Sequence, residues 1–217
     1  MPETLLDALR HPFSVVVLSY LLGSLSFAVI VSRFMGLSDP RSYGSKNPGA
    51  TNVLRSGSKK AAVLTLLLDA VKGWLPVFWV MQQGEAFGLA DGTAAAAGLA
   101  AFLGHLYPVF FRFQGGKGVA TALGVLVGVN PLLGLAIATT WVGSAWFFRY
   151  SSLAALLAAI LAPVYYAMGG DVVWPLKAPI VGLLCVMAVL LVWRHRENVN
   201  RLLAGTESKL RAKKEAP

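Results

Sequence analysis

Residues 61–81 read AAVLTLLLDAVKGWLPVFWVM, an apolar run with only two charged side chains, Asp69 and Lys72. A helix of about 20 consecutive apolar residues is what crossing the hydrocarbon core of a bilayer requires. One unpaired charge within such a span would cost about 2.5–3.5 kcal/mol. We therefore predict a spanning helix in which Asp69 and Lys72 give structural support by pairing with each other or with Arg55.

The whole chain has the composition of a membrane protein. Of its 217 residues, 56% are hydrophobic and only 13% are charged, and the mean hydropathy is +0.64. Such a chain is too apolar for an ordinary soluble domain and indicates a polytopic membrane protein. The net charge of +9 is typical of nucleic-acid binding or of cytoplasmic membrane loops, and an apolar chain favours the second. We expect no nucleic-acid partner.

Six further apolar segments surround the first one. They cover residues 12–35, 93–111, 119–129, 132–148, 153–168 and 176–193. Segment 119–129 has only about half the length of a span, so it forms a short tilted helix or a hairpin with its neighbour. The predicted fold class is all-α, a polytopic membrane helical bundle of seven transmembrane helices, with five as the alternative count. Residues 1–205 form one integral membrane domain, and 206–217 form a basic, polar cytoplasmic tail.

The basic residues decide the predicted orientation, because Lys and Arg accumulate at the cytoplasmic ends of spans. If the loop after the first segment is cytoplasmic, all of the 19 Lys and Arg residues except Arg10, Lys72 and Lys177 lie inside or in the tail. The opposite face then carries acidic residues: Glu3, Asp7, Glu85, Asp91 and Asp171. We therefore expect the N-terminus outside and the C-terminus in the cytoplasm.

The loop from Tyr43 to Arg55 is the first of three polar clusters on the predicted cytoplasmic face. Its donors and cations suit an anionic, phosphate-like ligand, and its glycines permit turns that aim backbone N–H groups inward. A solvated connecting loop would carry similar residues. The candidate ligand-binding residues in and just before this loop are Arg41, Ser45, Asn47, Gly49, Thr51, Asn52 and Arg55.

The second cluster is the glycine loop Gly115-Gly116-Lys117-Gly118. Its glycines allow close approach of the backbone to a ligand, Lys117 adds a charge, and a helix beginning near Val119 would point its N-terminal amides at the same place. The spacing is not that of a Walker A loop. An ordinary glycine turn before a helix is the alternative.

The third cluster follows the last span. A helix that continues past residue 193 would place His195, Asn198 and Arg201 on one stripe, where a histidine and an amide can act on one ligand. A basic helix end resting on lipid headgroups is the alternative. Glu197 points off this stripe and is expected to give structural support. His105 has no second ligand at metal spacing, so we expect a buried core residue and no metal site.

Taken together, these stretches resemble the bacterial membrane acyltransferases of the PlsY family. The resemblance lies in residues 23–25, 39–55, 104–105, 115–121 and 194–198, in this order over nearly the whole chain. Ser26 departs from the family, in which proline is common at this position. The resemblance implies a single enzyme of the inner membrane whose active site is on the cytoplasmic face.

By resemblance, the reaction transfers an acyl chain from acyl phosphate to the 1-hydroxyl of sn-glycerol 3-phosphate, as the first step of phospholipid synthesis. The products are lysophosphatidate and inorganic phosphate, and neither a cofactor nor a metal is needed. The implied catalytic residues are Ser45, Arg55, Lys117, His195 and Asn198. The resemblance also implies that the glycine loop around Lys117 binds phosphate. Together with the interpretation of the residues themselves, the predicted phosphate-binding residues are Arg41, Asn47, Gly49, Thr51, Asn52, Gly115, Gly116, Gly118 and Arg201.

The expected partners are the two substrates, the lipid bilayer and, functionally, the enzyme that makes acyl phosphate. Two alternatives differ in their polar pattern. A transporter for a phosphorylated solute would carry polar groups along a path through the membrane. A CDP-alcohol phosphotransferase would need paired Asp motifs, but Asp91-Gly92 is not followed by the further Gly and Asp residues of such a site.

Overall fold

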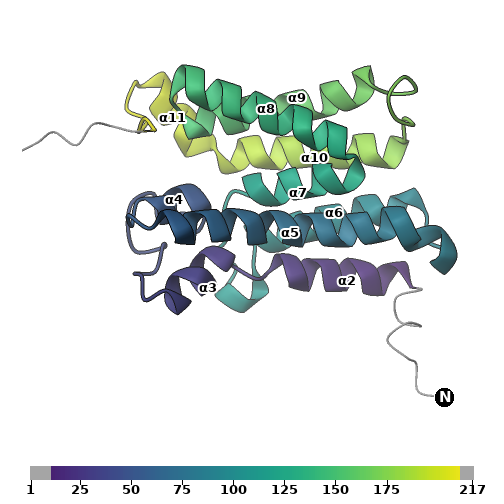
Figure 1. The fold of residues 1–217 in the computed structure, drawn as a ribbon, viewed down its shortest axis with the longest axis horizontal. Coiled ribbons are helices and arrows are strands. Elements are labelled where there is room, and N and C mark those ends of the chain that lie inside the picture. Colours follow the sequence, from purple (N-terminus) through teal and green to yellow (C-terminus); the bar gives the residue numbers. More distant parts are fainter. Residues whose placement is uncertain (1–10, 211–217) are drawn as a thin grey trace, which may run out of the picture.

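The computed structural model describes residues 11–210, which form a bundle whose long helices run side by side (Figure 1). The α-helices are α2 (Pro12–Gly23), α3 (Phe27–Phe34), α4 (Ala50–Leu54), α5 (Lys59–Gln83), α6 (Asp91–Leu106), α7 (Val119–Val129), α8 (Pro131–Phe148), α9 (Ser151–Met168), α10 (Ala178–Arg194) and α11 (Arg196–Leu203). Two 3-10 helices, η1 (Gly84–Phe87) and η2 (Val109–Phe111), extend α5 and follow α6. Each of the seven apolar segments contains a helix, which confirms the all-α prediction for this part of the chain.

Several of these helices are long and apolar enough to cross a membrane. Four meet that requirement alone, namely α5 with η1, α6 with η2, α8 and α9. The bent pairs α2–α3 and α10–α11 raise the number to six. The remaining predicted span, α7, has 11 residues, so a count of seven stays a prediction.

The first predicted span is not continuous. Its axis bends by 44° between α2 and α3, at the segment Ser24-Leu25-Ser26. The bend leaves the carbonyl of Leu25 without its helical partner, and the ammonium of Lys72 donates a hydrogen bond to it over 2.7 Å. Backbone polar groups inside a membrane need such internal partners. The span predicted over residues 12–35 is therefore a broken one, and a side chain of α5 stabilises the break.

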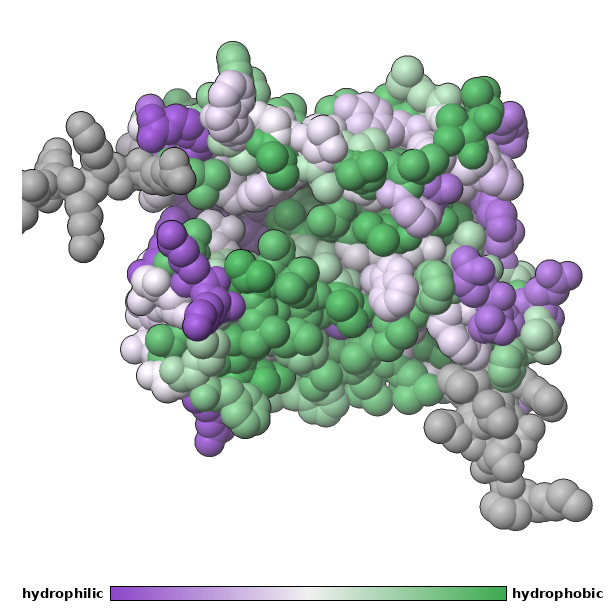
Figure 2. All heavy atoms as spheres, in the orientation of Figure 1, coloured by the Kyte–Doolittle hydropathy of each residue, from purple (hydrophilic) through white to green (hydrophobic). Residues whose placement is uncertain are grey.

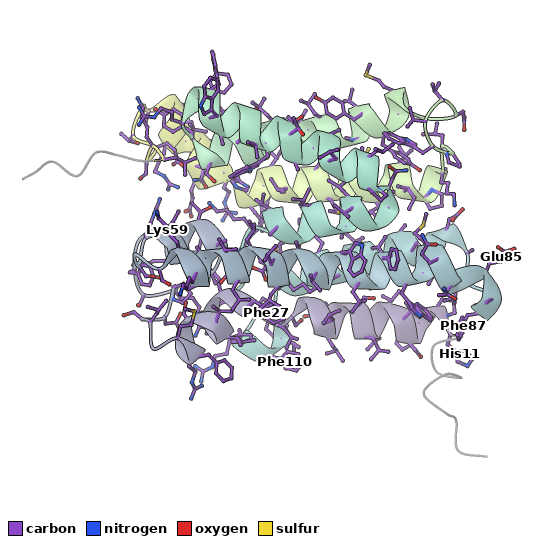
Figure 3. The ribbon with its side chains drawn as sticks, in the orientation of Figure 1. His11, Phe27, Lys59, Glu85, Phe87 and Phe110 are labelled. Atoms are coloured by element: carbon purple, nitrogen blue, oxygen red, sulfur yellow. The ribbon has the colours of Figure 1, made fainter. Side chains whose placement is uncertain are left out.

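Asp69 and Lys72 pair with each other, which confirms one of the two predicted arrangements. The Lys72 Nζ lies 2.7 Å from the Asp69 carboxylate, and both side chains are almost fully buried. His105 Nδ1 lies 3.6 Å from the same carboxylate oxygen. We call these three residues the buried ion cluster. Lys72 also lies over the ring of Phe27, 5.6 Å from its centroid, so the cluster joins α5 and α6 to the first residue of α3 (Figure 3).

Glycines allow the helices around α5 to approach closely. A Cβ atom on Gly124 of α7 would lie 1.9 Å from the carbonyl oxygen of Ala70 on α5. Likewise, a Cβ atom on Gly73 would lie 2.2 Å from the carbonyl oxygen of Thr121. Small residues at crossings are the usual way in which membrane helices pack. The short α7 is thereby pressed against α5.

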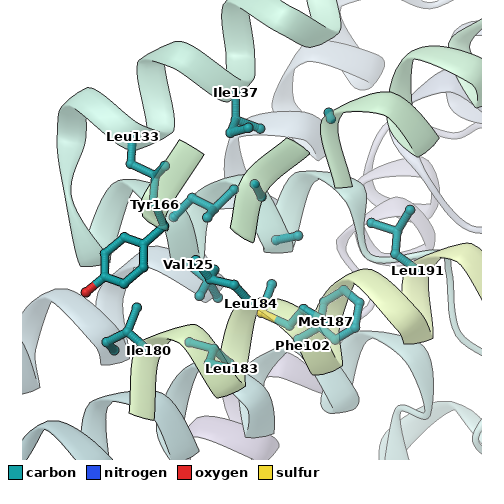
Figure 4. Packing of buried hydrophobic residues seen from close by; sticks show 14 of the residues in the cluster. Phe102, Val125, Leu133, Ile137, Tyr166, Ile180, Leu183, Leu184, Met187 and Leu191 are labelled. Carbon is teal, nitrogen blue, oxygen red and sulfur yellow. The ribbon is translucent and has the colours of Figure 1, made fainter. Parts of the chain in front are cut away.

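The largest apolar core lies between α6, α7, α8, α9 and α10 (Figure 4). It includes Phe102, Val125, Leu133, Tyr166, Ile180 and Leu184. Outside the core, apolar side chains of α5 such as Leu64, Leu67 and Leu75 remain exposed. Figure 2 shows an apolar band across the middle of the visible face, with hydrophilic residues toward the two ends. This pattern is that of a multi-pass membrane protein.

Candidate active site

The three polar clusters line one pocket at the end of the bundle where α4 and α11 lie (Figure 1). The cavity has a volume of about 460 Å³. We call it the basic pocket, and it is lined by Gly44, Ser45, Lys46, Asn47, Arg55, Gly115, Lys117, Arg194, Arg196, Glu197, Asn198, Arg201, Glu207 and Ser208. Three clusters that are distant in sequence, which we predicted to share one face, therefore meet at one cavity.

Cations outnumber carboxylates in this pocket by six to two. The cations are Lys46, Arg55, Lys117, Arg194, Arg196 and Arg201, and the carboxylates are Glu197 and Glu207. A concave surface with such an excess of one sign attracts ligands of the opposite sign. Glu197 was expected to lie off the ligand-binding stripe, but it borders the cavity.

Asn52 organises the first loop from within. Its side chain is 2% exposed, its Oδ1 accepts a hydrogen bond from the Ser45 N–H over 3.0 Å, and its Nδ2 donates to the Pro40 carbonyl over 2.6 Å. Gly44 has φ of +57°, and a Cβ atom there would lie 2.3 Å from Asn52 Oδ1. The structure therefore uses Asn52, which we predicted as a ligand-binding residue, to hold Ser45 at the pocket.

The other predicted residues of the first loop divide into two groups. Ser45, Asn47 and Arg55 line the pocket, whereas Gly49 is the N-terminal cap residue of α4 and lies outside the lining. Thr51 points its hydroxyl at Ser151 of α9, with 3.5 Å between the two oxygens. The first loop thus contacts α9 as well as the cavity.

Arg41 lies away from the basic pocket. Its guanidinium pairs with Asp39 over 2.6 Å, and it borders a different cavity together with Phe110, Phe111, Arg112 and Gln114. The same ion pair lowers the pKa of Asp39 below its usual value, with the hydrogen bond from Arg41 as the main cause. The structure thus separates Arg41 from the other predicted phosphate-binding residues.

The glycine loop lies between α6 and the pocket. Gly115 and Lys117 line the cavity, whereas Gly116 is buried and donates its N–H to the His105 carbonyl over 3.1 Å. Gly118 has φ of +83° and is the cap residue of α7, which begins at Val119 as predicted. The loop is therefore part of the pocket wall, with two of its glycines facing protein.

Lys117 lines the pocket and contacts α11. Its ammonium donates a hydrogen bond to the side-chain carbonyl of Asn198 on α11. Burial lowers the pKa of Lys117 to about 8, and the nearby guanidinium of Arg201 contributes in the same direction. Lys117 is thus mostly protonated at pH 7 and loses its charge just above that range.

The last span does not continue straight into α11, because the chain bends by 57° between α10 and α11. His195 lies at this bend, is 3% exposed, and does not border the cavity. Its Nδ1 lies 2.8 Å from the Leu191 carbonyl, which only accepts, so this nitrogen carries the proton. Burial lowers the pKa of His195 to about 4, so the ring is neutral at pH 7.

The expected stripe of His195, Asn198 and Arg201 is only partly formed. Asn198 and Arg201 share one face of α11, since both bind the carboxylate of Glu207, whereas His195 lies at the bend itself, before α11 begins. The expectation of a continuous helix was wrong because the chain turns at His195.

Glu207 is a pocket residue that the sequence analysis placed in a polar tail. Its carboxylate accepts hydrogen bonds from Ser152 Oγ (2.6 Å), Asn198 Nδ2 (2.6 Å) and Arg201 Nε (2.7 Å). Burial raises the pKa of Glu207, but these three hydrogen bonds outweigh that effect and the pKa is lowered overall. An acidic residue shortly after α11, at the start of a basic segment, was the available signal. The remaining tail, residues 211–217, lies outside the described residues.

Arg194 is a second residue that we did not single out. Its guanidinium donates hydrogen bonds to the carbonyls of Gly115 and Gly116 in the glycine loop.

Within residues 11–210, no group of three His, Cys, Asp or Glu side chains is arranged to hold a metal ion. The arrangement is suited to binding and orienting anions through cations, amides and hydroxyls.

Comparison with known proteins gives a consistent result. A family model described as glycerol-3-phosphate acyltransferase matches residues 13–205. A glycerol-3-phosphate acyltransferase of Albidiferax ferrireducens is 60% identical over 210 residues, which is 96% of this chain and 94% of the relative. One from Burkholderia cenocepacia (strain HI2424) is 62% identical over 200 residues, covering 91% of this chain and 90% of the relative.

Two solved structures are also similar to this chain. Both are crystal structures of PlsY, described as an integral membrane glycerol 3-phosphate acyltransferase. The glycerol 3-phosphate form matches with a TM-score of 0.84 at 40% identity, covering 91% of this chain and 94% of that one. The lysophosphatidic acid form matches with a TM-score of 0.82 at 39% identity, with the same coverage.

Proposed function

The chain belongs to the glycerol-3-phosphate acyltransferase family, and from this premise we propose that it transfers an acyl chain from acyl phosphate to the 1-hydroxyl of sn-glycerol 3-phosphate. The products are 1-acylglycerol 3-phosphate and inorganic phosphate. The observation that carries this proposal is the basic pocket, in which six cations from three distant segments of the chain surround one cavity. Both substrates carry a phosphate group, and the similar PlsY structures are described as glycerol 3-phosphate and lysophosphatidic acid forms.

The chemistry needs little from the protein beyond positioning and charge stabilisation. The hydroxyl oxygen attacks the acyl carbon, the bond from that carbon to the phosphate oxygen breaks, and the proton of the hydroxyl ends on the released phosphate. Because phosphate is already a good leaving group, no strong general base is required. Arg55 and Lys117 hold phosphate oxygens and stabilise the charge that develops on them.

Ser45, Asn198 and His195 act as orienting groups in this proposal. Ser45 and Asn198 line the cavity with a hydroxyl and an amide that can hold the glycerol backbone. His195 is neutral at pH 7 and lies behind the lining, where it fixes the start of α11. It therefore orients the site without having to accept the proton.

The location of the reaction follows from the two kinds of substrate. The acyl chain lies among apolar helices or in lipid, while glycerol 3-phosphate enters from water. Because basic residues gather at cytoplasmic ends of spans, the pocket opens on the cytoplasmic face of the bacterial inner membrane, with the N-terminus outside. An enzyme that makes acyl phosphate is then a functional partner.

A transporter for a phosphorylated solute is not favoured. Such a protein needs polar groups at mid-membrane depth along an open path. Here the buried charges Asp69 and Lys72 are paired and nearly inaccessible to solvent.

The choice of acyl donor tests the proposal directly. Purified protein is mixed with glycerol 3-phosphate and either palmitoyl phosphate or palmitoyl coenzyme A, and lysophosphatidate is measured. We expect product from the acyl phosphate alone. Product only from the thioester, or none from either donor, would overturn the proposal.

A further inference from the structure

Arg194 is the last residue of α10, and its guanidinium donates hydrogen bonds to the glycine loop. Nη2 donates to the carbonyl oxygens of Gly115 and Gly116 over 2.9 Å each, and Nε donates to the Gly116 oxygen over 3.2 Å. The guanidinium also lies over the ring of Tyr107, 5.7 Å from its centroid. Two successive carbonyls are thereby held by one planar group.

The opposite side of the loop is fixed by α6. Gly116 donates its N–H to the His105 carbonyl over 3.1 Å. A Cβ atom on Gly115 would lie 2.2 Å from that same carbonyl oxygen, and one on Gly116 would lie 2.3 Å from His105 Nε2. The glycines therefore sit in a space that admits no side chain, between His105 on one side and Arg194 on the other.

This arrangement decides which backbone atoms an anion meets. In a trans peptide the carbonyl and the following N–H point in opposite directions, so binding the Gly116 oxygen to Arg194 turns the N–H of Lys117 away from Arg194. Glycine peptides rotate at low cost, and a free loop could turn its carbonyl oxygens toward a phosphate. Carbonyl oxygens repel anions, whereas N–H groups bind them.

We propose that Arg194 is a positioning residue, which holds the Gly115 and Gly116 carbonyls so that the loop presents the Lys117 N–H, and no carbonyl oxygen, to a substrate phosphate. This inference rests on the proposed function for its ligand, but the conformation of the loop can be tested without turnover. The role depends on the planar fork of arginine, which reaches two carbonyls at once, and a lysine ammonium at the same place is a poor replacement. A direct contact between the Arg194 charge and phosphate would tolerate lysine better.

The test compares Arg194→Lys with the wild-type full chain in detergent. An Arg33→Lys variant serves as the matched control, because Arg33 is exposed at the end of α3. Kinetics with palmitoyl phosphate give KM for glycerol 3-phosphate and kcat separately. Hydrogen exchange of peptides covering residues 112–119 reports on the loop, and peptides from α8 report on the rest of the fold.

We expect Arg194→Lys to raise KM by about tenfold and to speed exchange in the loop by about tenfold, with α8 unchanged. Arg33→Lys should leave both quantities at the wild-type value. If hydrogen exchange in the loop of Arg194→Lys stays at the wild-type rate, the inference is overturned. A raised KM would then indicate direct contact between Arg194 and phosphate, and an unchanged KM would indicate no role for Arg194 in binding. If the wild-type protein has no activity with acyl phosphate, the proposed function fails, and the exchange measurement still decides the role of Arg194.

Discussion

The buried ion cluster inside the bundle and the basic pocket at its end both gather charged side chains, but only the first balances them. In the cluster, one carboxylate faces Lys72 at 2.7 Å and His105 at 3.6 Å, and all three side chains are buried. In the pocket, six cations face two carboxylates around an open cavity. Balanced, enclosed charge is typical of structural support, whereas an accessible excess of one sign indicates a ligand.

Removing a cation from the pocket should therefore damage activity and spare the fold. We expect Arg55→Ala and Lys117→Ala each to lower turnover by about a thousandfold, because each removes a charge that stabilises phosphate oxygens in the transition state. The assay uses palmitoyl phosphate, and thermal unfolding in detergent should stay close to wild type. Near-normal rates in both variants would place the phosphate sites elsewhere.

Removing the cation of the cluster should have the reverse effect. Lys72→Met leaves the Asp69 carboxylate buried without its partner and the Leu25 carbonyl without its donor. We expect a loss of stability of about 3–5 kcal/mol, measured as a lower unfolding temperature in detergent. The double variant Asp69→Asn/Lys72→Met removes both charges and should recover much of this loss. A single variant as stable as the wild type would show that the pairing contributes little.

The two regions also differ in how much of them the sequence predicted. The spacing of Asp69 and Lys72 on one helix within an apolar run predicted that they could pair, but the sequence left Arg55 open as a second partner, and the structure shows the pairing within α5. The bend at Leu25 was missed because its stabilising donor, Lys72, comes from another helix. The pattern of apolar residues predicts that a helix forms. It does not predict a break in that helix when the break is stabilised by a side chain from another helix.

In the pocket, the sequence predicted which charged side chains gather, but it did not predict which side chains hold the backbone of the loops in place. Lys117 and Arg55 stand in polar, glycine-containing loops, so their place at a shared polar site could be inferred from residue type and charge asymmetry, and both line the pocket. Arg194 donates hydrogen bonds to two glycine carbonyls. Because every residue has a backbone carbonyl, the sequence does not show which carbonyls Arg194 binds. Asn52 looked like a ligand-binding amide, but its atoms are used within the loop.

A variant of Glu207 shows whether a carboxylate in the pocket wall can support anion binding by holding its neighbours in place. Glu207→Gln weakens the hydrogen bonds that the carboxylate accepts from Arg201 and Asn198. The side chains of Arg201 and Asn198 should then be held less firmly at the pocket wall. We expect turnover to fall by about tenfold, since a hydrogen bond involving a charged group contributes about 1.5–3 kcal/mol. Glu85→Gln, at the opposite end of the bundle, is the control and should behave as wild type (Figure 3). A Glu207→Gln variant with improved affinity for glycerol 3-phosphate would instead mean that Glu207 competes with the substrate.

The smallest predicted effect is a pH dependence, and it separates the two titratable groups near the pocket. The pKa of His195 is about 4, so we expect no change in rate through pH 6 to 7 from this residue. The pKa of Lys117 is about 8, so its charge is lost as the pH rises through 8 and activity should decline there. The rate is measured from pH 6 to 9 at saturating glycerol 3-phosphate, because the phosphate of this substrate itself titrates at about pH 6.

The same lysine should make stability and activity move in opposite directions. In the unfolded chain Lys117 keeps a pKa near 10.5, so between about pH 8 and 10.5 the unfolded state binds more protons than the folded one. Stability from this group therefore rises with pH while activity falls. Lys117→Arg keeps its charge throughout this range, so whatever activity it retains should show no decline near pH 8. A decline that persists unchanged in Lys117→Arg would assign it to another group.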